Sequence, residues 1–268
     1  MCLILAAWQT HPQYPLVIAA NRDENFARPT CSAAFWPEAP NLLAGRDLSG
    51  GGTWLGITRG DRSFRFASLT NYRDPQREKQ IATSRGSLVT GFLQDTTKTL
   101  DYLAEVELIG DSYNGFNLMV SDGETLACYN NIEHQTRILE PGIHGLSNHV
   151  INTPWPKVTT ATSALEVSLH ALPDTDELFN FLRNEAIAGD ADLPNTGIPL
   201  EMERRLSAIF VRATADSAYG TRSSTVLVVG RNNEVFFDEQ EWNTNASQSH
   251  RQRFRFTLDK PNHGHPSR

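Results

Sequence analysis

The sequence predicts an α+β protein in which two mainly antiparallel sheets stack on each other and helices cover their outer faces, a four-layer α-β-β-α sandwich. Strand-like runs come in pairs separated by short turns, and such hairpins build antiparallel sheets. The predicted helices are grouped between these pairs instead of following each strand, which argues against a parallel, doubly wound sheet.

The first hairpin has apolar strands at Leu3–Trp8 and Leu16–Ala20, joined by a polar segment that contains two prolines. Nearly continuous apolar strands indicate that both faces of the hairpin are covered. If the turn is centred near Pro12–Gln13, ladder pairing brings Cys2 opposite Asp23 or a close neighbour.

The remaining elements are predicted from turn residues and apolar spacing. Residues 28–41, rich in Pro, Ser and aromatic residues, are expected to form an ordered loop, and the glycines at 50–52 a turn that precedes a strand. Further along we expect strands at 53–58 and 64–71, helices at 84–94 and 98–107, a hairpin at 116–120 and 125–129, short extended pieces at 137–139 and 145–148, helices at 157–170 and 174–188, a loop at 190–200, a helix at 201–212, and strands at 222–229, 234–237 and 254–258.

The chain of 268 residues is long enough to bury a core without covalent staples. We expect one domain over residues 1–258 and a loose tail at 259–268. The hydrophobic fraction of 39% and the charged fraction of 21% are ordinary for a globular protein. The net charge of −7, with no long basic run, argues against a nucleic acid as the partner. The sequence carries no signal for an oligomeric state.

The three cysteines, at positions 2, 31 and 128, form no CxxC pair and accompany no histidine cluster. We therefore expect neither a disulfide framework nor a metal site, and scattered thiols suit a reducing compartment. The apolar run at the N-terminus follows no basic region and ends after Trp8, too soon for a signal peptide or a membrane span. The expectation is a cytoplasmic protein without stable membrane insertion.

Cys2 is the first candidate for chemistry. A penultimate cysteine is small enough for the initiator methionine to be removed, which would leave a thiol and a free α-amine on one residue. The amine can take the thiol proton during attack on a carbonyl, as it does for N-terminal threonine nucleophiles. The alternative is that Cys2 is a small buried hydrophobic residue at the start of a strand.

The second candidate is the charged run Asn21-Arg22-Asp23-Glu24, which follows the apolar strand paired with Cys2. Its carboxylates can hold an α-ammonium, and its guanidinium can lower the pKa of the thiol or bind an anionic group. The alternative is an ordinary solvated strand end.

Several blocks of sequence carry a family resemblance. They are Asn21-Arg22-Asp23-Glu24, Gly45-Arg46-Asp47, the GGTWLG block at 51–56, the LTNYR block at 69–73, the GLSN block at 145–148, the NTPWPK block at 152–157, and the YGTRSSTV block at 219–226. In this order they resemble the NRDE family, the family of transport and Golgi organisation protein 2-like proteins. That family is in turn similar to the choloylglycine hydrolases and penicillin V acylases, which are cysteine N-terminal-nucleophile amidohydrolases.

The resemblance implies a fold of the N-terminal-nucleophile hydrolase type and a set of site residues. By that resemblance the catalytic residues are Cys2, Arg22, Asp23, Asn71, Asn148 and Arg222, and the ligand-binding residues are Asn21, Glu24, Arg46 and Arg73. Cys2 looks like the nucleophile and Asn71 like the asparagine of the oxyanion hole. One departure is that Arg22 and Asp23 are adjacent here, whereas the hydrolases separate their arginine and aspartate by three residues.

Two functions follow as expectations. The first is a hydrolase in which Cys2 attacks an amide or thioester bond of a small substrate without a cofactor. The second is a non-catalytic binding or carrier protein for acyl-CoA, other lipids or haem, which the family's connection to lipid metabolism and haem transport implies. No CxxCH haem-attachment motif is present, and the arginines at 22, 46, 73 and 222 offer partners for the phosphates of coenzyme A.

Overall fold

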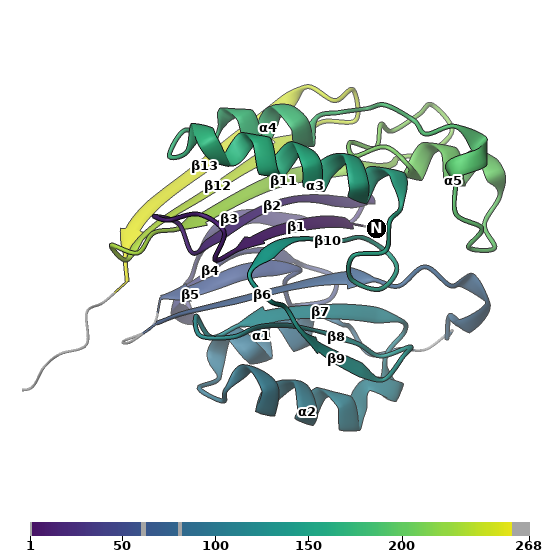
Figure 1. Cartoon of the computed structure of the whole chain (residues 1–268). Coiled ribbons are helices and arrows are strands. Elements are labelled where there is room, and N and C mark those ends of the chain that lie inside the picture. Colours follow the sequence, from purple (N-terminus) through teal and green to yellow (C-terminus); the bar gives the residue numbers. More distant parts are fainter. Residues whose placement is uncertain (1, 60–62, 80–81, 259–268) are drawn as a thin grey trace, which may run out of the picture.

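The computed structural model describes residues 2–59, 63–79 and 82–258, and these form two antiparallel sheets with helices on their outer faces (Figure 1). The first sheet has the strand order β10 (Gly142–Leu146), β1 (Cys2–Trp8), β2 (Leu16–Asn25), β11 (Tyr219–Val229), β12 (Glu234–Trp242) and β13 (Gln248–Thr257). The second has the order β3 (Thr30–Trp36), β4 (Ala39–Asp47), β5 (Leu55–Arg59), β6 (Phe64–Asn71), β7 (Phe116–Ser121), β8 (Leu126–Asn130) and β9 (Gln135–Ile138).

Helices form the two outer layers (Figure 1). Helices α3 (Pro156–Ser168) and α4 (Asp176–Leu182) lie over the first sheet, and α1 (Gly86–Gln94) and α2 (Thr99–Ile109) over the second. A short helix α5 (Leu200–Leu206) follows on the side of the first sheet. The predicted four-layer α-β-β-α sandwich is therefore confirmed.

Strand β1 shows why the strands of the first hairpin have an almost continuously apolar sequence. Leu3 and Leu5 pack against the α3–α4 layer, whereas Ile4 and Ala6 pack between the two sheets. Because successive side chains of a strand point to opposite faces, a central strand between two covered faces needs apolar residues at every position. Cys2 pairs with Arg22, one residue from the pairing with Asp23 that centring the turn at Pro12–Gln13 predicts.

The prediction for residues 28–41 was wrong, because this segment forms strand β3 and the beginning of β4. Strand β3 is an edge strand with two register irregularities, and only Ala33 and Trp36 of its seven residues are buried. A bulged, half-exposed edge has no regular alternation of apolar and polar residues, so its sequence is typical of a loop.

Two predicted helices are too long. Helix α4 ends at Leu182, and α5 ends at Leu206. After each end the backbone bonds to other segments: Asn184 O accepts from Phe210 N, and Val211 exchanges hydrogen bonds with Thr221. These long-range bonds outweigh the local helical preference. The C-terminal strand is longer than predicted, β13 beginning at Gln248. The predicted tail at 259–268 lies outside the described residues.

Candidate functional site

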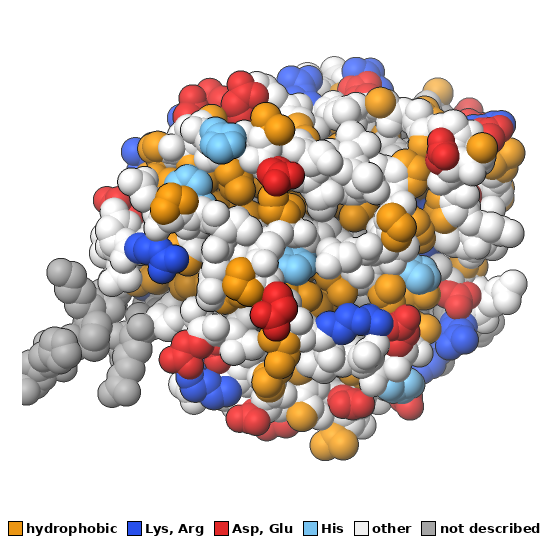
Figure 2. Space-filling model, viewed as in Figure 1, with side chains coloured by type: hydrophobic (Ala, Val, Ile, Leu, Met, Phe, Trp, Pro, Cys, Tyr) orange, Lys and Arg blue, Asp and Glu red, His pale blue; other side chains and the backbone are white. Residues whose placement is uncertain are grey.

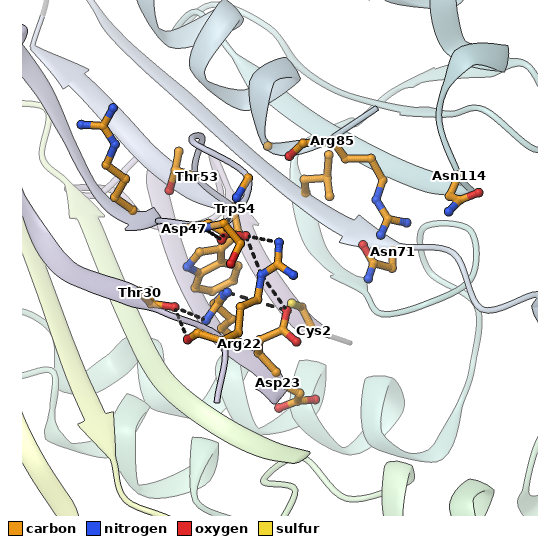
Figure 3. Close-up of a pocket in the computed structure, with 18 of the residues that line it drawn as sticks. Cys2, Arg22, Asp23, Thr30, Asp47, Thr53, Trp54, Asn71, Arg85 and Asn114 are labelled. Carbon is orange, nitrogen blue, oxygen red and sulfur yellow. Dashed lines mark hydrogen bonds and ion pairs between the residues drawn. The ribbon is translucent and has the colours of Figure 1, made fainter. Parts of the chain in front are cut away.

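A polar pocket of about 340 Å³ opens where strand β1 begins, between the two sheets (Figure 3). Its lining comes from both sheets and from the start of α1. The lining residues are Cys2, Arg22, Asp23, Glu24, Arg28, Thr30, Arg46, Asp47, Ser49, Gly50, Thr53, Trp54, Leu69, Asn71, Ala82, Thr83, Ser84, Arg85, Gly86 and Asn114. Segments separated by more than a hundred residues in the sequence therefore meet at Cys2.

Arg22 and Asp23 are adjacent in the sequence but lie on opposite faces of β2. Arg22 shares the inter-sheet side with Ala20, and its Nη1 is 3.4 Å from Thr30 Oγ1 of the facing sheet. The Asp23 carboxylate points away from the Arg22 guanidinium (Figure 3), and its Oδ1 accepts a 2.7 Å hydrogen bond from Thr221 Oγ1. Adjacent positions thus supply a cation on one side of Cys2 and a carboxylate on the other.

Arg222 sits in a bulge, because the pairing of β2 with β11 shifts register between Thr221 and Ser223. Its Nη1 donates to Arg28 O and, at 3.3 Å, to Thr30 Oγ1. Arg222 lines a second cavity of about 310 Å³ that shares Arg22, Thr30 and Trp54 with the first. It is therefore a neighbour of the pocket that contains Cys2 and not part of its lining.

Asn71 and Asn148 meet at the other wall. Asn71 ends strand β6 and lines the pocket, and its backbone oxygen accepts a 2.9 Å hydrogen bond from Asn148 Nδ2. Asn148 itself is fully buried, and Ser147 Oγ donates to the backbone oxygen of Cys2 at 3.2 Å. Residues 147–148 therefore join the beginning of β1 to the end of β6, and they fix the separation of the two walls.

The four residues with a predicted ligand-binding role divide into two pairs. Glu24 and Arg46 line the pocket, Glu24 lying 3.7 Å from Arg22. Asn21 faces the helix layer, where its Nδ2 donates to the backbone oxygens of Leu182 and Ile209.

Arg73 likewise lies outside the pocket lining. It is buried, with Nη1 2.6 Å from Glu203 Oε2 and its guanidinium 4.9 Å from the Trp155 ring centre.

Three charged residues of the lining, Arg28, Asp47 and Arg85, were not among the predicted site residues. Arg28 pairs with Asp47 at 2.8 Å, and Asp47 Oδ1 accepts hydrogen bonds from the backbone N–H groups of Ser49 and Gly50. The Gly45-Arg46-Asp47 block, one of those on which the family resemblance rests, was the available signal for Asp47. Arg28 falls in the segment that was predicted to be a loop.

The glycine turn at 50–52 packs against the start of α1. A Cβ at Gly52 would lie 2.4 Å from the carbonyl carbon of Gly86, so only glycine allows this contact. Gly51 has a φ of +76°, which favours glycine for a different reason. The turn thereby brings Thr53 and Trp54 to one side of the pocket and Ser84–Gly86 to another.

The charges of the pocket are nearly balanced, with four guanidinium groups against three carboxylates among its lining residues. Burial raises the pKa of the Cys2 thiol, and the Asp23 charge raises it further while Arg22 lowers it. Burial also raises the pKa of Asp23, against the opposing effect of the Lys157 charge and the Thr221 hydrogen bond. These surroundings favour the protonated form of the thiol.

Among residues 2–59, 63–79 and 82–258, no group of three or more His, Cys, Asp or Glu side chains is arranged to hold a metal ion. Within the same described residues, none of the helices has the length and apolar character needed to cross a membrane.

The face drawn in Figure 2 carries acidic and basic side chains that are interspersed.

Fold and site together define a two-sheet α+β sandwich protein with a cysteine at the start of a central strand, in a polar pocket. The profile of the Transport and Golgi organisation 2 family matches residues 1–244, and the chain belongs to this family. The human Transport and Golgi organization protein 2 homolog is 38% identical over 90% of this chain and 92% of its own length. The mouse homolog is 36% identical over 92% of this chain and 98% of its own, and the Drosophila melanogaster protein 27% over 91% and 96%.

Among solved structures, a Gly-1 mutant of Anbu from a Hyphomicrobium strain is similar at 11% identity, with a TM-score of 0.33. The comparison covers 97% of this chain and 90% of that one.

Proposed function

We propose that this protein is a cysteine N-terminal-nucleophile hydrolase that cleaves an amide or thioester bond of a small substrate. The observation that carries the proposal is the meeting of Cys2 and Arg22, from one sheet, with Asn71 from the other around a single pocket. Polar residues at strand ends that served only solvation would not converge from two sheets on one buried thiol.

In the proposed reaction the α-amine of a mature chain that begins at Cys2 accepts the thiol proton as sulfur attacks the carbonyl carbon. The carbonyl oxygen becomes an oxyanion, and we assign its stabilisation to the side-chain amide of Asn71, which lines the pocket. The leaving thiol or amine takes the proton when the bond to the carbonyl carbon breaks, and an acyl-thioester on Cys2 remains. Water then releases the acid and restores the thiol.

The charged lining supports a substrate with an anionic part. Arg28 is paired with Asp47 and Arg46 with Glu38, so these guanidinium groups are held in place. Arg22 lies farther from its carboxylate, at 3.7 Å from Glu24, and can turn to a ligand. An acyl-CoA thioester supplies both a reactive carbonyl and phosphates for such groups.

The test is turnover of acyl-CoA thioesters and N-acyl amides by the wild-type protein and by Cys2→Ala. The proposal requires product release by the wild type and none above background by the variant. Equal product release by both proteins would show that the thiol is not the nucleophile.

The second candidate is a carrier that binds such a ligand without cleaving it, and the raised pKa of the buried Cys2 thiol favours it. Titration calorimetry with palmitoyl-CoA, free coenzyme A and haem separates the two candidates. A carrier binds one of them stoichiometrically and leaves it unchanged after hours, and Cys2→Ala binds it equally well.

A further inference from the structure

One arginine of the Cys2 pocket differs from the others in its charge balance. The lining contains Arg22, Arg28, Arg46 and Arg85. The first three lie 3.7, 2.8 and 2.5 Å from a carboxylate oxygen. Within residues 2–59, 63–79 and 82–258, no carboxylate forms an ion pair with Arg85. This guanidinium therefore brings to the pocket a positive charge that no described side chain neutralises by direct contact.

The backbone holds the Arg85 guanidinium beside Asn71. Arg85 immediately precedes helix α1, and its Nη1 donates a 3.0 Å hydrogen bond to Gly115 O. The same oxygen accepts a 2.9 Å hydrogen bond from the N–H of Tyr72, the residue that follows Asn71. Figure 3 shows the guanidinium extending from the start of α1 toward Asn71. One backbone oxygen thus fixes Arg85 next to the residue to which we assign stabilisation of the oxyanion.

The single hydrogen bond of Arg85 leaves most of its donors available. A guanidinium carries five N–H donors in a planar fork, which matches the oxygens of a carboxylate or a phosphate. Arg85 is half-buried, so an anion bound to it is shielded from water on the protein side and is attracted more strongly than in bulk solvent. The geometry is therefore that of an anion-binding group without its anion.

We infer that Arg85 is a substrate-binding residue, which selects substrates that carry a carboxylate or a phosphate near the scissile bond. The inference rests on the proposed function, because it takes Cys2 as the attacking group. Cys2 and Arg85 line one pocket of about 340 Å³, the size of a site for a small molecule. An anion on Arg85 and a carbonyl at Cys2 therefore belong to neighbouring parts of the substrate.

The experiment compares alkylation of Cys2 by iodoacetate and by iodoacetamide in the full-length protein. With both reagents the thiolate displaces iodide from a CH₂ group, and the reagents differ in carrying a carboxylate or a neutral amide of almost the same size. Peptide mass spectrometry gives the ratio of carboxymethyl to carbamidomethyl product at each cysteine. Because both reagents react with the same thiolate, this ratio does not depend on the pKa of the thiol.

Arg85→Gln removes the charge and should lower the ratio at Cys2 about tenfold, since hydrogen bonds to charged groups are strong ones. The ratio at the exposed Cys31 should not change. Arg85→Lys keeps the charge and should give a ratio between those of the wild type and Arg85→Gln. Arg77→Gln, the matched control, removes an exposed cation that pairs with Asp74 outside the pocket lining, and should give wild-type ratios. An unchanged ratio at Cys2 in Arg85→Gln overturns the inference.

A measurement on the wild type covers the case in which the Arg85 variants fail to fold. At constant ionic strength, propionate or inorganic phosphate should slow carboxymethylation of Cys2, and neutral propionamide should not. The stronger of the two competitors identifies the anion as a carboxylate or a phosphate. Lack of competition by both, or lack of any labelling at Cys2, contradicts the inference.

These measurements need no turnover, so the inference and the proposed hydrolase activity can fail separately. An unchanged ratio in an Arg85→Gln protein that still hydrolyses an acyl-CoA would remove Arg85 from the site and leave the proposed function. A lowered ratio in a protein whose wild type hydrolyses no substrate would retain the anion site and favour the carrier.

Discussion

Single residues of β2 show why its charged run is not a solvated strand end. Arg22 and Asp23 are buried, and alternation along the strand sends one toward the inter-sheet pocket and the other toward the helix layer. Two adjacent residues can therefore serve two sides of Cys2 without a bulge in β2. The bulge lies in the partner strand β11, at Arg222.

Cys2→Ala is the most informative substitution for the proposed function. It deletes one heavy atom, so the fold should persist with a melting temperature close to that of the wild type. Turnover of an acyl-CoA should fall by about a thousandfold or more, because the covalent route is lost. Steady-state kinetics beside circular dichroism measures both effects, and wild-type kcat in the variant would refute the assignment.

Glu239 gives a pH-dependent prediction for stability. Its carboxyl is buried in the second cavity, where Oε1 accepts a 2.7 Å hydrogen bond from Ala33 N, and burial raises its pKa to about 7. Because the folded-state pKa lies above the unfolded value of 4.5, the folded protein holds this proton more tightly. The bound proton on Glu239 therefore adds to the free energy of unfolding. This stabilisation is complete below about pH 4.5 and is lost as the pH rises through 7.

Glu239→Gln keeps an acceptor for Ala33 and removes the titration. Between pH 5 and 8 the free energy of unfolding of the wild type should fall relative to that of the variant, by roughly 3 kcal/mol at most. Urea denaturation at several pH values measures the difference. Parallel pH profiles for the two proteins would mean that Glu239 is hydrated or already ionised at low pH.

The sequence predicts the site in part, for reasons that are specific to each residue. Cys2, Arg22 and Asn71 were identified because motif resemblance and strand ends coincide at them, and all three line the pocket. Asn21 and Arg73 belong to the same motifs, yet their side chains point into the protein on other faces. The direction in which a side chain points depends on strand register and on partners far along the chain. A local sequence pattern carries no information about either.

At the scale of elements, the sequence predicts best where a segment is buried on both faces. Strand β1 was predicted to within one residue and the apolar first half of β2 at its observed start, because their apolar runs are continuous; β6 was predicted with its observed bounds, although polar residues interrupt its apolar ones. Edge strand β3 was missed, and the ends of α4 and α5 were misplaced. In these segments long-range hydrogen bonds and irregular register, rather than local preference, decide the conformation.

The contact between the glycine turn and α1 makes a prediction at this scale. Gly52→Ala places a methyl group against the backbone of Gly86, and we expect it to cost roughly 2 kcal/mol by overpacking. Gly51→Ala, the matched control, meets no atom within 4 Å and should cost about 1 kcal/mol from its positive φ alone. Thermal denaturation measures both, and an equal loss would mean that the turn moves away from α1 freely.

For the whole molecule, an internal ion pair links the second sheet to the helices over the first. Arg73 follows β6, Glu203 lies on α5, and both side chains are at most 5% exposed. In Glu203→Gln the buried Arg73 guanidinium loses the negative charge that offsets its removal from water. The free energy of unfolding should therefore fall by roughly 3 kcal/mol.

Glu201 is on the same helix and provides a matched control. It pairs with Arg204 in solvent, and such pairs contribute about 0.5 kcal/mol or less. Denaturant titrations of Glu201→Gln and Glu203→Gln should therefore differ clearly. Similar small losses would show that the pair does not hold the layers together.

If Cys2 is an N-terminal nucleophile, it should form a covalent acyl-enzyme that mass spectrometry can detect. The purified protein is mixed with palmitoyl-CoA, quenched in acid within seconds and digested, and its N-terminal peptide is weighed. We expect a peptide that begins at Cys2, with a transient palmitoyl adduct on the sulfur that decays as free acid appears. A peptide that retains Met1 and carries no adduct at any time, while palmitoyl-CoA remains intact, would contradict it.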